Sequence, residues 1–137
     1  PEEIRKKKLF LHFYWLNAYL NIIETAIRRE EYETAAFHVY LSLKELSEIS
    51  FLIENQFVPI DKWKFHEMKK LKLGRKQLSK VRALMQIKEV SKKELEDKLA
   101  LLKRMNQELK RYLVAAGVKK EKLGPKWWKF EPEWNAG

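Results

Sequence analysis

The sequence predicts an all-α fold: an antiparallel helical bundle of four main helices plus one short helix, with a Trp-rich C-terminal tail packed on it. Only 4 Gly and 4 Pro occur in 137 residues, while Leu, Lys and Glu dominate, and this composition favours helices over turn-rich β structure. Apolar residues also recur at intervals of three and four, which is the spacing of a buried helix face. The length suits a single helical domain, 1–137, whose tail at 118–137 is expected to be extended or irregular.

The first two helices are expected at residues 3–29 and 31–55. The segment "REEYET" between them makes a tight, charged corner, so the two helices should pack as an antiparallel αα-hairpin. The predicted buried positions of the first helix are Ile4, Leu11, Trp15, Ala18, Ile22 and Ala26. Those of the second helix are Ala36, Val39, Tyr40, Leu43, Leu46, Ser50 and Ile53.

The stretch "ENQFVPIDKWKFHEMKKL" at 54–71 leads from this hairpin into the short helix. Pro59 disfavours helical backbone at Val58, so "FVPI" is expected to be a short extended crossing. Asp61 is the predicted N-cap of a helix over 61–72, with Trp63 anchoring it in the core and Gly74 ending it.

Two further helices complete the expected bundle. The third main helix is predicted at 75–89, with Leu78, Val81, Leu84, Met85 and Ile87 as its apolar residues. "SKKE" at 91–94 is a capping-box pattern that should start the last helix, and Gly117 should cap its end. Its predicted buried register is Leu95, Leu99, Leu102, Asn106, Leu109, Leu113 and Ala116. Asn106, the polar member, is interpreted as a core residue that fixes helix alignment.

The tail "KWWKFEPEW" holds three of the five Trp residues and is too aromatic to be a free linker. One interpretation is that Trp127, Trp128, Phe130 and Trp134 fold back onto the bundle. The other is that they form a docking surface for a partner.

The positive charge is concentrated in the second part of the chain. Residues 1–58 hold 7 Lys/Arg and 9 Asp/Glu, a net charge of −2, whereas 59–137 hold 22 and 10, a net charge of +12. Residues 62–82 contain nine basic groups against one acid, Glu67. Such a concentration attracts polyanions, whether nucleic acid, a nucleotide or an acidic domain. Lys62 and Lys64 follow a helix start, where the dipole favours acids, so we expect them to hold an anion. The predicted anion- or nucleotide-binding residues are Asn55, Lys62, Trp63, Lys64, His66, Lys69, Lys70, Arg75 and Lys76.

The sequence offers no complete catalytic constellation. The two Asp residues, 61 and 97, are not paired, and the four Gly residues are isolated, so neither a two-metal carboxylate site nor a Gly-rich phosphate loop is indicated. The three His residues lack metal-ligand spacing, and His12 and His38 are interpreted as helix-face histidines without a partner beside them. Arg5 and His12, with six residues between them, resemble the nuclease motif of some HEPN domains, although that motif opens the first helix here rather than lying late in the bundle.

The composition also indicates the cellular compartment of the protein. Cys is absent, which excludes disulfides and thiolate metal sites and favours a reducing, cytoplasmic location. The longest apolar run, 9–23, is shorter than the roughly 18 residues of a membrane span and is interrupted by polar residues, so no membrane association is expected. Because the chain starts at Pro1 without an initiator Met, we expect it to be a fragment of a longer protein or a processed chain.

The stretch "SEISFLIENQFVPIDKWKFHEMKKL" resembles the helical domain that follows the catalytic domain in kanamycin-nucleotidyltransferase-like proteins, a fold group related to HEPN. The resemblance covers about residues 10–75. It rests on an Asn, an aromatic residue, a Pro and a Lys-Trp pair, which are here Asn55, Phe57, Pro59, Lys62 and Trp63.

The resemblance implies that the catalytic residues and this helical domain belong to separate units. In that family the catalytic Gly-Ser and paired acidic residues belong to a separate N-terminal α/β domain, so Mg²⁺ and nucleotide would belong to that partner and no cofactor to this chain. A carboxylate of the helical domain serves as a base in some relatives, and Glu45, Glu48 and Glu54 are candidates by location.

Three hypotheses follow from these observations. The first is a helical accessory domain of a nucleotidyltransferase-like protein that binds nucleotide or substrate phosphates and associates with its N-terminal nucleotidyltransferase domain, a separate catalytic partner or a second copy as a homodimer. The second is a free-standing basic bundle that binds RNA or DNA. The third is an HEPN-type ribonuclease that uses Arg5 and His12.

Overall fold

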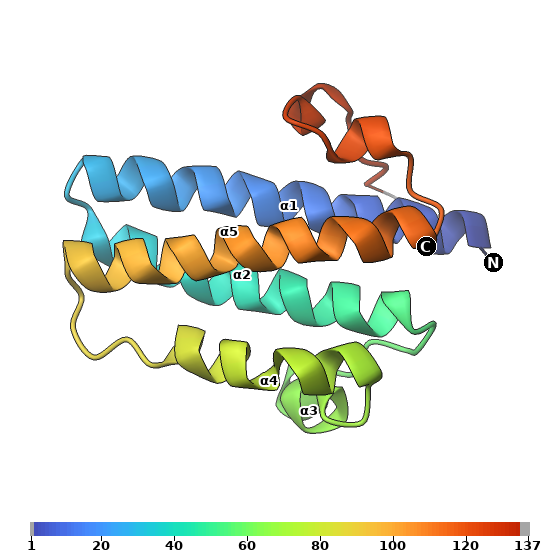
Figure 1. The fold of residues 1–137 in the computed structure, drawn as a ribbon, viewed down its shortest axis with the longest axis horizontal. Coiled ribbons are helices and arrows are strands. Elements are labelled where there is room, and N and C mark those ends of the chain that lie inside the picture. Colours follow the sequence, from blue (N-terminus) through green and yellow to red (C-terminus); the bar gives the residue numbers. More distant parts are fainter. Residues whose placement is uncertain (1, 135–137) are drawn as a thin grey trace.

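The computed structural model describes residues 2–134, which form an all-α bundle and contain no strand (Figure 1). This confirms the predicted fold class. The helices are α1 (Glu2–Arg28), α2 (Tyr32–Ile53), α3 (Asp61–Met68), α4 (Lys72–Met85) and α5 (Lys92–Ala115). Two 3-10 helices, Lys120–Leu123 and Trp127–Lys129, follow in the tail. Within the described range, no helix has both the length and the apolar character that crossing a membrane requires.

Helices α1 and α2 run side by side as the expected antiparallel hairpin (Figure 1). The turn between them is tight because Glu30 adopts a left-handed backbone with φ of 60°. Most of the buried face of α1 was predicted wrongly. Ala26 is buried as predicted, but Ile4 and Ile22 are exposed. The other three predicted positions, Leu11, Trp15 and Ala18, are only partly buried. The fully or almost fully buried residues of α1 are Leu9, Phe10, Phe13, Leu16, Leu20, Ile23, Ala26 and Ile27. Because α1 is apolar around most of its circumference, periodicity alone does not select the face that meets α2 and α5.

Most of the predicted face of α2 is buried. Val39, Leu43, Leu46 and Ser50 lie in the core, whereas Tyr40 was misplaced because it is 61% exposed. The buried register of α5 is confirmed from Leu95 to Leu113, with Ala116 partly buried.

The buried polar residue Asn106 pairs with Asn17 of α1. The two side-chain amides exchange hydrogen bonds of 3.1 and 3.0 Å, and Asn17 also donates to the carbonyl of Phe13 at 2.9 Å. This confirms that Asn106 is a satisfied core residue. At the end of α5, Gly117 takes a φ of 99° and caps the helix as predicted. Ser91 is the N-cap residue of α5, but its side chain makes no capping bond, so the reciprocal bonds of the predicted capping box do not form.

The predicted boundaries of α3 and α4 are wrong by several residues. The short helix ends at Met68 rather than at 72, and the next helix begins at Lys72 and ends at Met85. Gly74 therefore lies in the first turn of α4, where a Cβ would collide with the carbonyl oxygen and the side chain of Met68. The earlier start of α4 is stabilised from outside, since the Glu54 carboxylate accepts the backbone N–H groups of Lys72 and Leu73 at 3.0 and 2.9 Å.

The tail folds back beside the N-terminal half of α1 (Figure 1). Trp127 packs edge-on against Tyr14 with ring centroids 5.0 Å apart, and Trp134 contacts Trp15 at 5.5 Å. Trp127 and Phe130 are partly buried against the core, while Trp128 and Trp134 are more than half exposed. The tail is thus packed on the bundle, and it contains two short 3-10 helices where an irregular segment was expected.

Candidate functional site

A groove of about 620 Å³ opens where α1 begins and α2 ends. One wall comes from α1, another from the last turns of α2, and the third from the connection that follows α2. The lining residues are Ile4, Arg5, Lys8, Leu11, His12, Glu48, Leu52, Asn55, Gln56, Phe57 and Val58. Its lining thus combines apolar walls with basic groups from α1 and one carboxylate from α2.

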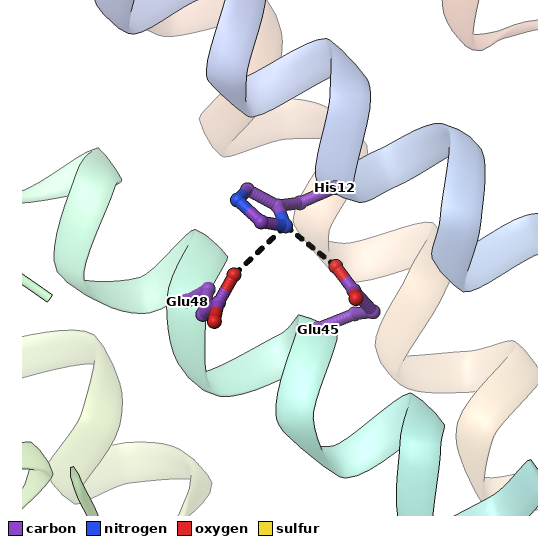
Figure 2. Close-up of side chains that lie close together, drawn as sticks. All are labelled: His12, Glu45 and Glu48. Carbon is purple, nitrogen blue, oxygen red and sulfur yellow. Dashed lines mark hydrogen bonds and ion pairs between the residues drawn. The ribbon is translucent and has the colours of Figure 1, made fainter. Parts of the chain in front are cut away.

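His12 lies beside this groove between two carboxylates of α2 (Figure 2). Glu45 and Glu48 are three residues apart and project from the same side of α2 toward α1. The Nδ1 atom of His12 lies 2.6 Å from Oε2 of Glu45 and 3.0 Å from Oε2 of Glu48. The expectation that His12 has no partner was therefore wrong. Its partners come from the neighbouring helix, which a search along the local sequence does not see.

The two carboxylates keep the His12 imidazole protonated. Burial alone would lower the pKa of His12, but the hydrogen bonds to Glu45 and Glu48 and the charges of both outweigh burial and raise the pKa from 6.5 to about 9. Burial would raise the pKa of Glu48, yet its bonds to His12 and Lys64 lower it to about 2. A histidine that is protonated at neutral pH is a poor general base. It is suited to donate hydrogen bonds or to contact an anion.

Lys64 extends this cluster to α3. Its side chain is only 4% exposed, and its ammonium group donates to Glu48 at 3.1 Å and to Asp61 at 2.9 Å. The prediction that Lys64 holds an external anion was therefore wrong, because two carboxylates of the chain already bind it. Burial favours a lower pKa for Lys64, but these carboxylates raise it above its ordinary value. The neighbouring ammonium of Lys64 in turn lowers the pKa of Asp61.

Two other predictions for α3 are corrected. Asp61 is the first helical residue and Ile60 precedes it as the N-cap, so the Asp61 carboxylate serves Lys64 rather than the helix start. Trp63 is 50% exposed and does not anchor α3 in the core. Lys64 and Met68 form the buried side of α3 instead. Lys62 lies over the outward-facing Trp63 ring, with its Nζ 5.3 Å from the ring centroid.

The three side chains of Figure 2 are a group that could hold a metal ion, since one ligand atom from each lies within 4.8 Å of the others. Their charges are already balanced, because the His12 imidazolium and the Lys64 ammonium compensate the two carboxylates. A divalent ion would have to displace the proton on Nδ1 of His12. The short distances from nitrogen to oxygen fit hydrogen bonds that this proton makes.

The remaining predicted site residues fall into two places. Asn55 lines the groove and has a left-handed backbone with φ of 56°. The side chains on the outer surface of α3, the following turn and α4 are Lys62, His66, Lys69, Lys70, Arg75 and Lys76, all exposed. Of these, Lys70 forms an ion pair with Glu67 at 3.0 Å. Sequence reasoning missed Lys8, although Arg5, Lys8 and His12 share one side of α1 by their spacing of three and four.

Two residues singled out for chemistry have structural contacts. Arg5 donates to the carbonyls of Leu52 and Ile53 at 2.6 and 2.5 Å and so caps the end of α2. Arg5 and His12 do line the same groove, as a shared nuclease motif requires. Glu54, a candidate base by location, caps α4 through Lys72 and Leu73.

No protein-family model, curated protein or solved structure matches this chain. The likeness to the helical domain of kanamycin-nucleotidyltransferase-like proteins therefore stays a prediction from residues 10–75.

Proposed function

We propose that the chain is a helical accessory module of a nucleotidyltransferase-like protein, and that it binds nucleotide or substrate phosphates through a basic face on α3 and α4. One observation carries this proposal. Within the described residues 2–134, six exposed basic side chains of this face have no ion-pair partner. They are Lys62, Lys69, Lys72, Arg75, Lys76 and Arg82. Uncompensated charges of one sign raise the local concentration of oppositely charged ligands.

Aromatic side chains accompany the basic groups on α3. Trp63 and His66 meet at a ring-centroid distance of 6.3 Å, and both are exposed beside Lys62. An aromatic surface next to ammonium groups is suited to a ligand that combines a planar base with phosphates. Lys64 does not belong to this surface, because its ammonium points into the chain.

The connection before α3 supports association with another domain or subunit. Phe57 is fully exposed, and Val58 and Ile60 also present apolar surface to solvent. A run of exposed apolar side chains is typical of a surface that a partner covers. In the proposed arrangement, an N-terminal nucleotidyltransferase domain, a separate catalytic chain or a second copy covers this segment, and the catalytic residues, Mg²⁺ and nucleotide belong to the catalytic partner.

Charge reversal tests the proposed phosphate-binding face. The variant Lys69→Glu/Arg75→Glu/Lys76→Glu should bind ATP about tenfold more weakly or worse, because each exposed contact contributes up to about 1 kcal/mol. The control is Arg28→Glu/Arg29→Glu, which reverses two basic charges instead of three, where α1 ends at the opposite end of the bundle (Figure 1). An equal loss in both variants, or no loss in either, would contradict the proposal.

The free-standing nucleic-acid binder is the second candidate, and the same basic face supports it. Its affinity for single-stranded RNA should fall steeply with salt, and the three reversals should reduce the slope of log K against log salt by about 2. RNA binding far tighter than ATP binding favours this candidate over the accessory module.

The ribonuclease candidate rests on the shared groove position of Arg5 and His12. RNA cleavage that is unchanged in His12→Ala would contradict the ribonuclease hypothesis.

A further inference from the structure

We propose that the groove between α1 and α2 is a second binding site, which takes a small organic anion with a planar apolar body, of the size and chemistry of a nucleoside monophosphate. The groove of about 620 Å³ lies within the usual range of small-molecule sites, about 300–1,000 Å³. Its lining places apolar side chains next to hydrogen-bond donors that carry positive charge. The following contacts identify the donors and the walls.

His12 supplies the first donor. Its Nδ1 is committed to Glu45 and Glu48, and the other ring nitrogen, Nε2, points away from both carboxylates (Figure 2). Because an imidazolium carries a proton on each nitrogen, Nε2 is an N–H donor. The two carboxylates thus orient the ring and maintain its charge, while the free edge remains available to a ligand of the groove that the ring lines.

Lys8 supplies the second donor. It lies one helical turn before His12 on α1, lines the same groove, and forms no ion pair with any residue of the described range 2–134. Arg5 is different, because its guanidinium already donates to the end of α2 and to Glu2. Lys8 and His12 are therefore the two basic groups of the lining that an incoming anion can bind.

Glu48 is the acidic side chain in the lining, but its electrostatic repulsion of an anion is reduced. One of its oxygens accepts from His12 and the other from Lys64, so both are engaged in charge-assisted hydrogen bonds. Arg5, Lys8 and His12 exceed this one carboxylate by two charges, and by one charge when Glu45, which binds His12 from outside the lining, is included. The groove is thus electropositive on balance.

The apolar walls of the groove indicate that the anion carries an apolar group. Leu11, Leu52 and Val58 form apolar surface, and the ring of Phe57 is 100% exposed beside them. An inorganic phosphate would use only the basic end of the groove, whereas a planar aromatic body would also remove these walls from water and could stack on Phe57. A nucleoside monophosphate combines both features.

This site shares nucleotide chemistry with the proposed phosphate-binding face but uses a different surface. Phe57 and Val58 of the groove also belong to the segment proposed to meet a partner, so the site is tested on the chain alone, in which both are exposed. The basic face lies on α3 and α4, and the groove lies on α1, α2 and the residues that follow α2. An assay of ATP or RNA binding to α3 and α4 does not measure AMP binding in the groove. An AMP titration of the groove likewise does not measure binding to α3 and α4. The two proposals can therefore fail separately.

An NMR titration of the 137-residue chain with AMP tests the site. We expect the largest amide shifts at Leu11, Leu52 and Phe57, with adenosine and inorganic phosphate each binding about tenfold more weakly than AMP. Lys8→Gln should weaken AMP binding about tenfold. Lys7→Gln is the matched control, because Lys7 is the adjacent lysine but lies outside the groove and pairs with Glu133 at 3.0 Å. That variant should change the affinity less than about twofold.

Phe57→Ser provides a variant that leaves the fold intact, because the Phe57 side chain packs on nothing in the described chain. It should weaken AMP several-fold while leaving the weak binding of inorganic phosphate unchanged. His12→Gln should abolish the preference for AMP over adenosine. Shifts confined to α3 and α4, equal effects of Lys7→Gln and Lys8→Gln, or AMP affinity that is unchanged by Phe57→Ser would each overturn the proposal.

Discussion

Deprotonating His12 is expected to weaken the fold markedly. The pKa of His12 is about 9 in the folded protein, against an ordinary value of 6.5. A pKa that folding raises adds stability that is fully present below pH 6.5 and that is lost as the pH rises through about 9. Because one pKa unit corresponds to about 1.4 kcal/mol, this contribution is about 3 kcal/mol. The lowered pKa of Glu48 describes the same ion pair from its other partner and is not added.

Urea unfolding near pH 6 and pH 10 measures this contribution. The free energy of unfolding of the unmodified protein should fall by about 3 kcal/mol more than that of His12→Gln over this interval. All other titratable groups are the same in both proteins, so their effects largely cancel in the difference. The imidazole NMR signals report the pKa directly. A His12 signal that titrates near 6.5, or an equal loss of stability in both proteins, would refute the assignment of a carboxylate-locked imidazolium.

Three further predictions concern the bundle. Asn106→Leu alone should lower the free energy of unfolding by about 1–3 kcal/mol because it leaves buried groups of Asn17 without partners. The double variant Asn17→Leu/Asn106→Leu should lose less than the sum of the two single variants. Denaturant curves of all three variants measure these losses. Gly117→Ala should destabilise by about 1–2 kcal/mol because an L side chain rarely adopts a φ of 99°, and thermal unfolding measures the loss. Glu54→Ala should cost about 1 kcal/mol and speed hydrogen exchange at Lys72. Unchanged exchange at Lys72 would contradict the role of Glu54 as a cap.

The helices could be predicted where one face alone is apolar. Helix α5 has leucines on one side and charged residues on the other, so its buried register followed from spacing. Helix α1 is apolar on several sides, and its contact with α2 and α5 decides which residues are buried. The start of α4 depends on Glu54, which lies 18 residues before Lys72, and on the close approach of Gly74 to Met68. A local capping pattern cannot contain either contact.

The candidate site was predicted only in part for a similar reason. Exposed lysines and arginines of α3 and α4 form a cluster in the sequence itself, so their charge was visible. The partners of His12 are 33 and 36 residues away, and they depend on how α1 and α2 align. Lys64 looked free because Asp61 of its own helix was assigned to the helix start, while Glu48 reaches it from α2.

The placement of the five tryptophans gives the molecule two separate optical reporters. Trp15, Trp127 and Trp134 belong to the aromatic contacts between α1 and the tail, and Trp128 follows Trp127 in the same segment. Trp63 stands alone on α3, half exposed and next to Lys62. A fluorescence change that Trp63→Phe removes therefore originates at α3. A change that survives this substitution originates where the tail meets α1, so emission spectra can distinguish a ligand on the basic face from detachment of the tail.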